Sequence, residues 1–166
     1  MRPDARFLIA HPTHFIALGF GSGLAPRAPG TFGTLAGWAL FPLISVPLGD
    51  ATFLALLAFF FVAGVFVCDR TGKALGVPDH GAIVWDEIVA IWLVLFFAPA
   101  TLFWQAVAVA LFRVFDILKP PPIRWADRHL KGGFGVMFDD LLAAGYAILI
   151  LAILVRLAGE FSWTMP

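Results

Sequence analysis

The chain has 166 residues, of which 61% are apolar and only 13% are charged. Soluble domains carry about 25% charged residues, so this composition indicates an integral membrane protein. The formal net charge is zero, which gives no field to attract nucleic acid. The single cysteine, Cys68, excludes a disulfide within one chain and a metal site built from several cysteines.

Five apolar stretches are candidates for membrane-spanning helices, which need roughly 20 residues each. They cover residues 34–49, 51–68, 83–98, 100–115 and 141–158. Pro42 and Pro47 interrupt the first stretch, and Pro99 indicates a turn between the third and the fourth. We therefore predict an all-α fold: a polytopic membrane helical bundle with about five short spans, forming one domain over residues 1–166.

The links between these stretches differ in length and charge. Residues 1–33, 69–82 and 116–140 are polar and rich in glycine and proline, whereas the other two links are very short. Five spans place the long links and an N-terminal segment, residues 1–13, on one side, and the short tail, residues 159–166, on the other. All lysines and arginines except Arg156 fall at or near the first side, so the positive-inside rule predicts that it is cytoplasmic.

The first motif with possible chemistry is "PDHGAIVWDEIV", residues 78–89. Asp79 and His80 suit a helix start, which would place Asp86 and Glu87 more than one turn inside the helix. Carboxylate oxygens are the ligands that Mg²⁺ prefers, so these acids indicate a metal site. The alternative is an N-terminal turn whose acids complement the helix dipole.

The second motif is "FRVFDILKPPPIRWADRHLKGG", residues 112–133. Asp116 and Lys119 are three residues apart and share one helix face, and the prolines that follow end the helix. Lysine and arginine bind phosphate, so Lys119 and Arg124 are candidates for substrate binding. The alternative is a solvated basic loop attracted to anionic headgroups. Asp127 is expected either to act in the site or to pair with Lys131, four residues later.

Two further motifs flank these. In "FDDLL", residues 138–142, Asp139 and Asp140 are expected to open the last span, where acids either bind metal or complement the dipole. The glycine-rich "GFGSGLAPRAPGTFGTLAG", residues 19–37, is either an anion cradle or an ordinary turn at the interface. In the cradle, donors would come from Arg27, Thr31 and Thr34.

Taken together and in this order, the four motifs strongly resemble the phosphatidylglycerophosphatase A family, over roughly residues 14–158. The resemblance implies an all-helical protein of the bacterial inner membrane that removes the terminal phosphate from phosphatidylglycerophosphate in a Mg²⁺-dependent reaction. The family's motif residues fall on Asp79, Asp86, Glu87, Phe115, Asp116, Lys119, Pro120, Asp139 and Asp140.

These residues suggest a mechanism in which metal-bound water attacks the phosphomonoester at the cytoplasmic face. The expected metal ligands are Asp86, Glu87, Asp116, Asp139 and Asp140. The expected catalytic carboxylates are Asp79, Asp86, Glu87, Asp116 and Asp140, with Asp79 or Asp140 taking the proton of the water. The expected substrate-binding residues are Arg27, Thr31, Thr34, Lys119 and Arg124.

Two other functions remain open at this point. Acids near membrane spans also suit a small divalent-cation transporter, although the acids expected here lie at one surface rather than at the bilayer midplane. A membrane phosphotransferase of lipid headgroups is the second alternative. Assembly into an oligomer is compatible with the sequence.

Overall fold

The computed structural model describes residues 2–159, and over that range its regular elements are all helices, which confirms the predicted all-α class. The predicted tail, residues 159–166, lies outside the described residues except for Gly159. The elements are α1 (Ala5–Ala10), α2 (Pro12–Ala17), the 3₁₀ segment η1 (Gly19–Leu24), α3 (Pro29–Ser45), α4 (Asp50–Leu75), α5 (Trp85–Phe96), α6 (Leu102–Leu118), α7 (Ile123–His129) and α8 (Gly132–Leu157).

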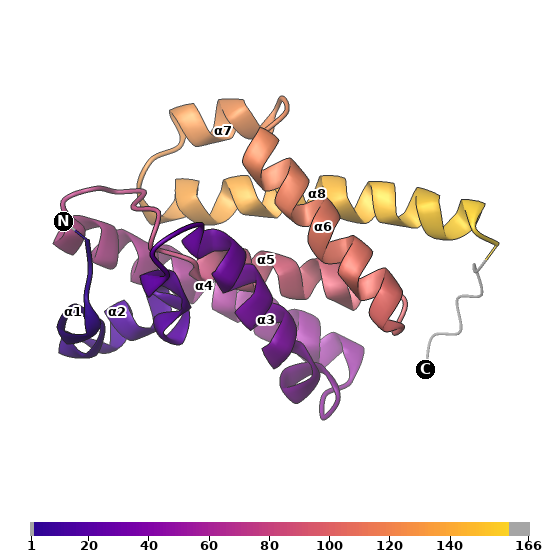
Figure 1. Ribbon diagram of the computed structural model, residues 1–166, viewed down its shortest axis with the longest axis horizontal. Helices are drawn as coiled ribbons and strands as arrows, with labels where there is room; N and C mark the ends of the chain where they lie inside the picture. The colour runs from indigo at the N-terminus through magenta and orange to yellow at the C-terminus, as the bar shows by residue number, and fades with distance from the viewer. Residues whose placement is uncertain (1, 160–166) are drawn as a thin grey trace.

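Helix α5 lies at the centre of the molecule and packs against α3, α4, α6 and α8 (Figure 1). It is apolar on nearly every side after its first turn, as expected of a helix enclosed by others. The indole of Trp92 is buried and donates a hydrogen bond to the Gly37 carbonyl of α3, at 2.7 Å. Gly37 allows this close packing, because a Cβ there would lie 2.7 Å from Ile91.

Each predicted apolar stretch overlaps one helix, α3, α4, α5, α6 or α8, in that order. Two of them, α4 and α8, have 26 residues each and are long and apolar enough to cross a membrane. Helix α5 has 12 residues, which gives a length of about 18 Å against a hydrocarbon thickness of about 30 Å. It is therefore too short to cross a bilayer by itself.

The first predicted stretch is less interrupted than its prolines suggested. Helix α3 starts at Pro29, where the missing N–H costs nothing because the first-turn N–H groups have no partner within the helix. It continues through Pro42 and ends at Ser45, before Pro47. The expected break at Pro42 was wrong.

The start of α5 differs from the prediction. The Val84 N–H donates to the Ala17 carbonyl at 2.9 Å, and Val84 has φ −140° and ψ 9°, so its backbone is not helical. The helix begins only at Trp85. Asp86 and Glu87 therefore lie in its first turn, not beyond it, and Asp79 precedes the helix.

The start of α8 also differs, since this helix begins at Gly132 rather than near residue 141. Gly133 packs directly on α4, because a Cβ there would lie 1.8 Å from the Val65 carbonyl oxygen. This contact with α4 holds the glycine-rich segment in the helix. Asp139 and Asp140 consequently lie about two turns inside α8, so the expectation that they open it was wrong.

Candidate active site

Two adjacent carboxylates of α5 meet a third from α8, more than fifty residues later in the chain, where the two helices pack together. Asp86 and Glu87 come from the first turn of α5, and Asp140 comes from α8. One oxygen from each lies within 4.8 Å of the other two. We call Asp86, Glu87 and Asp140, with the neighbouring Asp116, the acid centre.

The acid centre is largely buried, and three of its carboxylates each have one oxygen without a hydrogen-bond partner among the described residues. Asp86 and Asp140 are only 8% and 3% exposed. Within residues 2–159, Asp86 Oδ1, Glu87 Oε2 and Asp140 Oδ2 are buried with no hydrogen-bond partner. Buried like charges at this spacing repel one another and cost free energy unless a cation joins them. Three convergent carboxylate oxygens fit Mg²⁺, which takes carboxylates and completes its shell with water and phosphate oxygens.

Asp116, near the end of α6, belongs to the same centre. The Asp116 carboxylate lies close enough to Asp140 to interact with it electrostatically, as Glu87 does. On its other side, Asp116 Oδ2 accepts a 2.7 Å ion pair from Arg113 Nη1, one helical turn earlier. Asp116 therefore links the other three acids of the centre to the largely buried guanidinium group of Arg113.

Arg113 was not among the residues selected from the sequence. Its guanidinium lies 3.7 Å from Glu87 Oε1 as well as bonding to Asp116, and only 16% of its side chain is exposed. One signal was present, namely an arginine inside an otherwise apolar stretch, three residues before an aspartate. Such a residue is costly in a membrane helix unless it faces a partner.

The N-terminus of α3 closes the centre on a third side. A Cβ on Gly30 would lie 2.2 Å from Glu87 Oε1, so only glycine allows this approach. The hydroxyl of Thr34 donates to the Gly30 carbonyl at 2.9 Å and accepts a 3.3 Å bond from Arg113 Nη1. Thr34 thus holds Arg113 in place, and Thr31 lies half-buried in the same first turn.

Lys119 bridges two other acids beside the centre. Its Nζ lies 2.5 Å from Asp127 Oδ1 and 2.6 Å from Asp139 Oδ2. Burial alone would lower the pKa of Lys119, but the hydrogen bonds to Asp127 and Asp139 outweigh it and keep the pKa above its ordinary value. Lys131 donates to the Asp127 backbone carbonyl, at 3.3 Å, and the Asp127 carboxylate pairs with Lys119 instead. Of the two alternatives for Asp127, the side-chain pair with Lys131 is therefore not the one that forms.

Adjacent residues of α8 therefore have different partners. Asp139 and Asp140 point about 100° apart around the helix. Asp140 faces Asp86 and Glu87, whereas Asp139 binds Lys119. The structure thus places Asp139 in an ion pair and Asp140 in the cluster of carboxylates.

Asp79 lies in the turn before α5, beside a polar pocket of about 180 Å³ that Asp127, Asp139 and Lys131 also line. The residue as a whole is exposed, yet its carboxyl group is partly withdrawn from water. This desolvation raises the pKa of Asp79 above its ordinary value, and the Lys119 ammonium offsets only part of the effect. Asp79 is the predicted catalytic acid with the readiest access to solvent.

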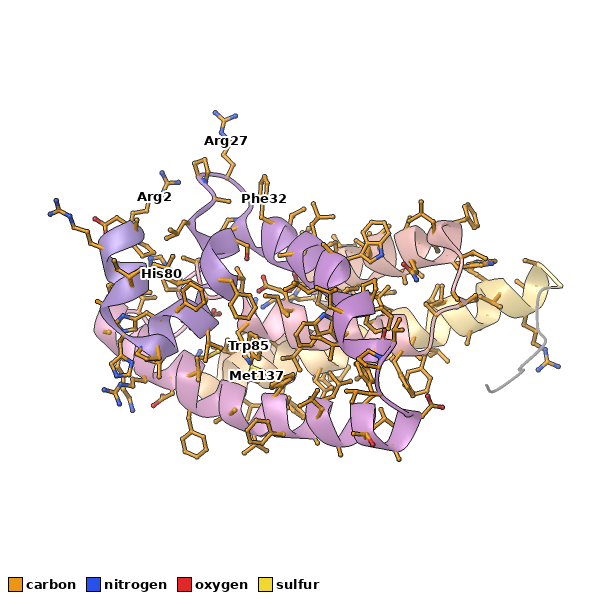
Figure 2. All side chains as sticks on the ribbon, turned by 90° about the horizontal axis from the view of Figure 1, so that it is seen from below. Arg2, Arg27, Phe32, His80, Trp85 and Met137 are labelled. Carbon is orange, nitrogen blue, oxygen red and sulfur yellow. The ribbon has the colours of Figure 1, made fainter. Side chains whose placement is uncertain are left out.

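The two predicted arginines lie further out. Arg27 is exposed, and its side chain projects away from the body of the protein (Figure 2). Arg124 is also exposed and donates a 3.2 Å hydrogen bond to the Leu118 carbonyl at the end of α6. The visible role of Arg124 is to satisfy a helix terminus.

The comparisons with known proteins agree on one family. The family model described as Phosphatidylglycerophosphatase A matches residues 15–155. Phosphatidylglycerophosphatase A of Haemophilus influenzae is 48% identical over 151 residues, which cover 90% of this chain and 92% of the relative. The Escherichia coli K12 protein of that name is 41% identical over 141 residues, covering 84% of this chain and 81% of the relative.

A third relative has a different description. A putative phosphatidylinositol-3-phosphatase of Bacteroides thetaiotaomicron is 39% identical over 145 residues, 83% of this chain and 90% of the relative. No solved structure matches the chain. The family match spans the segments that carry the acid centre, Arg113 and Lys119, and the chain therefore belongs to the phosphatidylglycerophosphatase A family.

Proposed function

We propose that this protein is a membrane-embedded lipid phosphatase that hydrolyses the terminal phosphomonoester of phosphatidylglycerophosphate, releasing phosphatidylglycerol and inorganic phosphate. The names of the two most similar relatives described above support this substrate. The observation that carries the chemistry is the set of three buried carboxylates that converge within 4.8 Å, each with one oxygen that has no hydrogen-bond partner among the described residues.

In this proposal Asp86, Glu87 and Asp140 hold Mg²⁺, with Asp116 beside them. When bound, the ion would neutralise charge on the phosphate and lower the pKa of a water molecule. Arg113 keeps Glu87 and Asp116 in position through its contacts at 3.7 and 2.7 Å. Its positive charge also offsets part of the negative charge that these two carboxylates bring to the centre.

Lys119 and the start of α3 are the proposed phosphate-binding groups. An ammonium has three N–H donors, and Asp127 and Asp139 accept two of them, which leaves one for a phosphate oxygen. The N-terminus of α3 presents backbone N–H groups and the positive end of the helix dipole beside Glu87. We assign proton transfer from the attacking water to Asp79, because its raised pKa and its access to solvent suit a general base.

The proposed setting is the bacterial inner membrane, with α4 and α8 crossing it and the shorter apolar helices packed between them. Asp86 and Glu87 lie in the first turn of α5, Asp116 lies near the end of α6, and Asp140 lies about two turns inside α8, in the halves of these helices that adjoin the long, basic links. The positive-inside rule assigns these links to the cytoplasm. The phosphate would therefore be removed at headgroup depth on the cytoplasmic face.

The test is an assay of the purified full-length protein with phosphatidylglycerophosphate, with and without Mg²⁺, followed by measurement of free phosphate. We expect phosphate release that requires the ion. A cation transporter would release none, and a phosphotransferase would move the headgroup without forming inorganic phosphate. Phosphatidylinositol 3-phosphate in parallel tests the activity that the name of the Bacteroides relative suggests.

A further inference from the structure

An apolar groove of about 360 Å³ lies between α4, α5 and α8. Leu57 and Ala58 of α4, Leu93 of α5 and Met137 of α8 are among the residues that line it. Asp86 is the one charged or polar residue in its wall, so the groove reaches the acid centre at one end and is apolar elsewhere.

The direction of the groove follows from its residues on α5. Asp86 and Leu93 are seven residues apart, so they share a face of α5 and lie about 10 Å apart along it. Met137, which also lines the groove, lies beside Trp85 (Figure 2), and both are within contact distance of a Cβ placed on Gly64 of α4. The groove therefore runs from the acid centre along α4.

The groove opens toward the surface that α4 exposes. Leu54 and Val62 form part of its wall and are 39% and 57% exposed. Helix α4 is one of the two helices long and apolar enough to cross a membrane, so its exposed apolar face would meet lipid. A hydrocarbon chain could enter the groove from the bilayer without crossing water.

Resting on the lipid phosphatase activity proposed above, we propose that this groove binds one acyl chain of the phospholipid substrate while its terminal phosphate occupies the acid centre. The substrate then reaches the site laterally from the bilayer. In this lipid a phosphodiester and two glycerol units separate the terminal phosphate from the acyl esters. Their single bonds allow the lipid to bend at the headgroup surface, so that the acyl chain can enter the groove while the phosphate stays in the acid centre.

The chemistry of the wall selects this occupant. Apart from Asp86, the wall offers no side-chain donor or acceptor, so a sugar, peptide or nucleotide would lose its hydration there without compensation. The volume lies in the range of roughly 300–1,000 Å³ that is typical of pockets for small ligands. A flexible hydrocarbon chain is the ligand class that such a wall suits.

The preference of the groove for the substrate over other lipids comes from the binding of the substrate's terminal phosphate at the acid centre. A chain gains little by moving from bilayer to groove, because both are apolar. A chain tethered to a phosphate already bound at the acid centre has a high effective concentration at the groove, whereas an untethered chain does not. The groove should therefore discriminate between lipids only when the acid centre is occupied.

The first test uses two matched variants of exposed alanines on α4, of which Ala58 lines the groove and Ala55 does not. In lipid nanodiscs, kcat/KM is measured for diacyl phosphatidylglycerophosphate and for its deacylated, water-soluble analogue. In Ala58→Phe the ratio of the diacyl value to the deacylated value should fall about tenfold, since phenylalanine fills the groove. In Ala55→Phe the ratio should equal that of the wild type.

Two results separate the hypotheses. If the wild type releases no phosphate from either substrate, the proposed phosphatase activity fails, and the acyl site fails with it. If the wild type is active but Ala58→Phe leaves the ratio unchanged, or lowers both values equally, the activity stands and the acyl site is refuted.

The second test needs no variant. A phosphonate analogue of the substrate, carrying a photoreactive diazirine in one acyl chain, is irradiated with the wild type in phosphatidylcholine nanodiscs containing Mg²⁺. Labelling should fall on groove residues such as Leu57 and Leu93, and phosphatidylcholine with the same chain should label them several times less. Equal labelling by both lipids would show that any bilayer lipid fills the groove, which overturns the proposal.

Discussion

Gly30 is the position where one added methyl group should greatly reduce activity without unfolding the protein. An alanine Cβ at this position would lie 2.2 Å from Glu87 Oε1 and 3.1 Å from Arg113 Nη1. Ordinary contacts of a Cβ begin at 3.4 Å, so the carboxylate must retreat by 3.4 − 2.2 = 1.2 Å. Glu87 would then leave its position beside Asp86 and Asp140.

The expected effects on stability and on catalysis differ in size. Gly30 is helical in α3 and needs no positive φ, so alanine gains about 1 kcal/mol of helix propensity. Overpacking against Glu87 costs about 1–3 kcal/mol, which leaves a small net loss of stability. A misplacement of about 1 Å in a catalytic group costs on the order of a hundredfold, and we expect kcat/KM to fall by about that factor.

The assay is Mg²⁺-dependent phosphate release from phosphatidylglycerophosphate, combined with thermal unfolding of the same preparation. Gly145→Ala on α8 is the matched control, because Gly145 is exposed and an added Cβ meets no atom within 4 Å. This control should keep wild-type activity and an equal or higher melting temperature. If Gly30→Ala stays within about threefold of wild-type kcat/KM, the Glu87 carboxylate is not the sensitive group that the geometry implies.

Three other substitutions probe the same region. Asp86→Asn removes one of three buried like charges, so it should raise the metal-free melting temperature, abolish turnover and reduce the stabilisation by Mg²⁺; a wild-type Mg²⁺ shift in this variant would contradict the metal assignment. Arg113→Gln leaves Glu87 and Asp116 without their cation and should lower the unfolding free energy by about 3 kcal/mol in chemical denaturation, more than Arg113→Lys does. Lys119→Ala should mainly raise KM in steady-state kinetics if its remaining N–H binds phosphate in ground and transition states alike, and a loss confined to kcat would count against that role.

Much of the architecture follows from the order of residue types along the chain. Five apolar stretches predict five of the helices, because a long apolar segment must satisfy its own backbone hydrogen bonds away from water. The acidic motifs likewise predict carboxylates close to the long polar links, and Asp116 lies near the end of α6 beside such a link, whereas Asp86 and Glu87 lie in the first turn of α5 rather than deeper in a helix as expected. These features depend on local composition, which the sequence displays directly.

The pairing of the charges was decided only by tertiary packing. Asp139 and Asp140 are chemically equivalent neighbours, yet one binds Lys119 and the other faces Asp86, because the orientation of α8 against α5 and α6 determines where each points. Arg113 joins the centre for the same reason, since α6 brings it to the start of α3. Contacts between helices distant in sequence depend on packing of whole surfaces, and the spacing of residues within one helix does not contain that information.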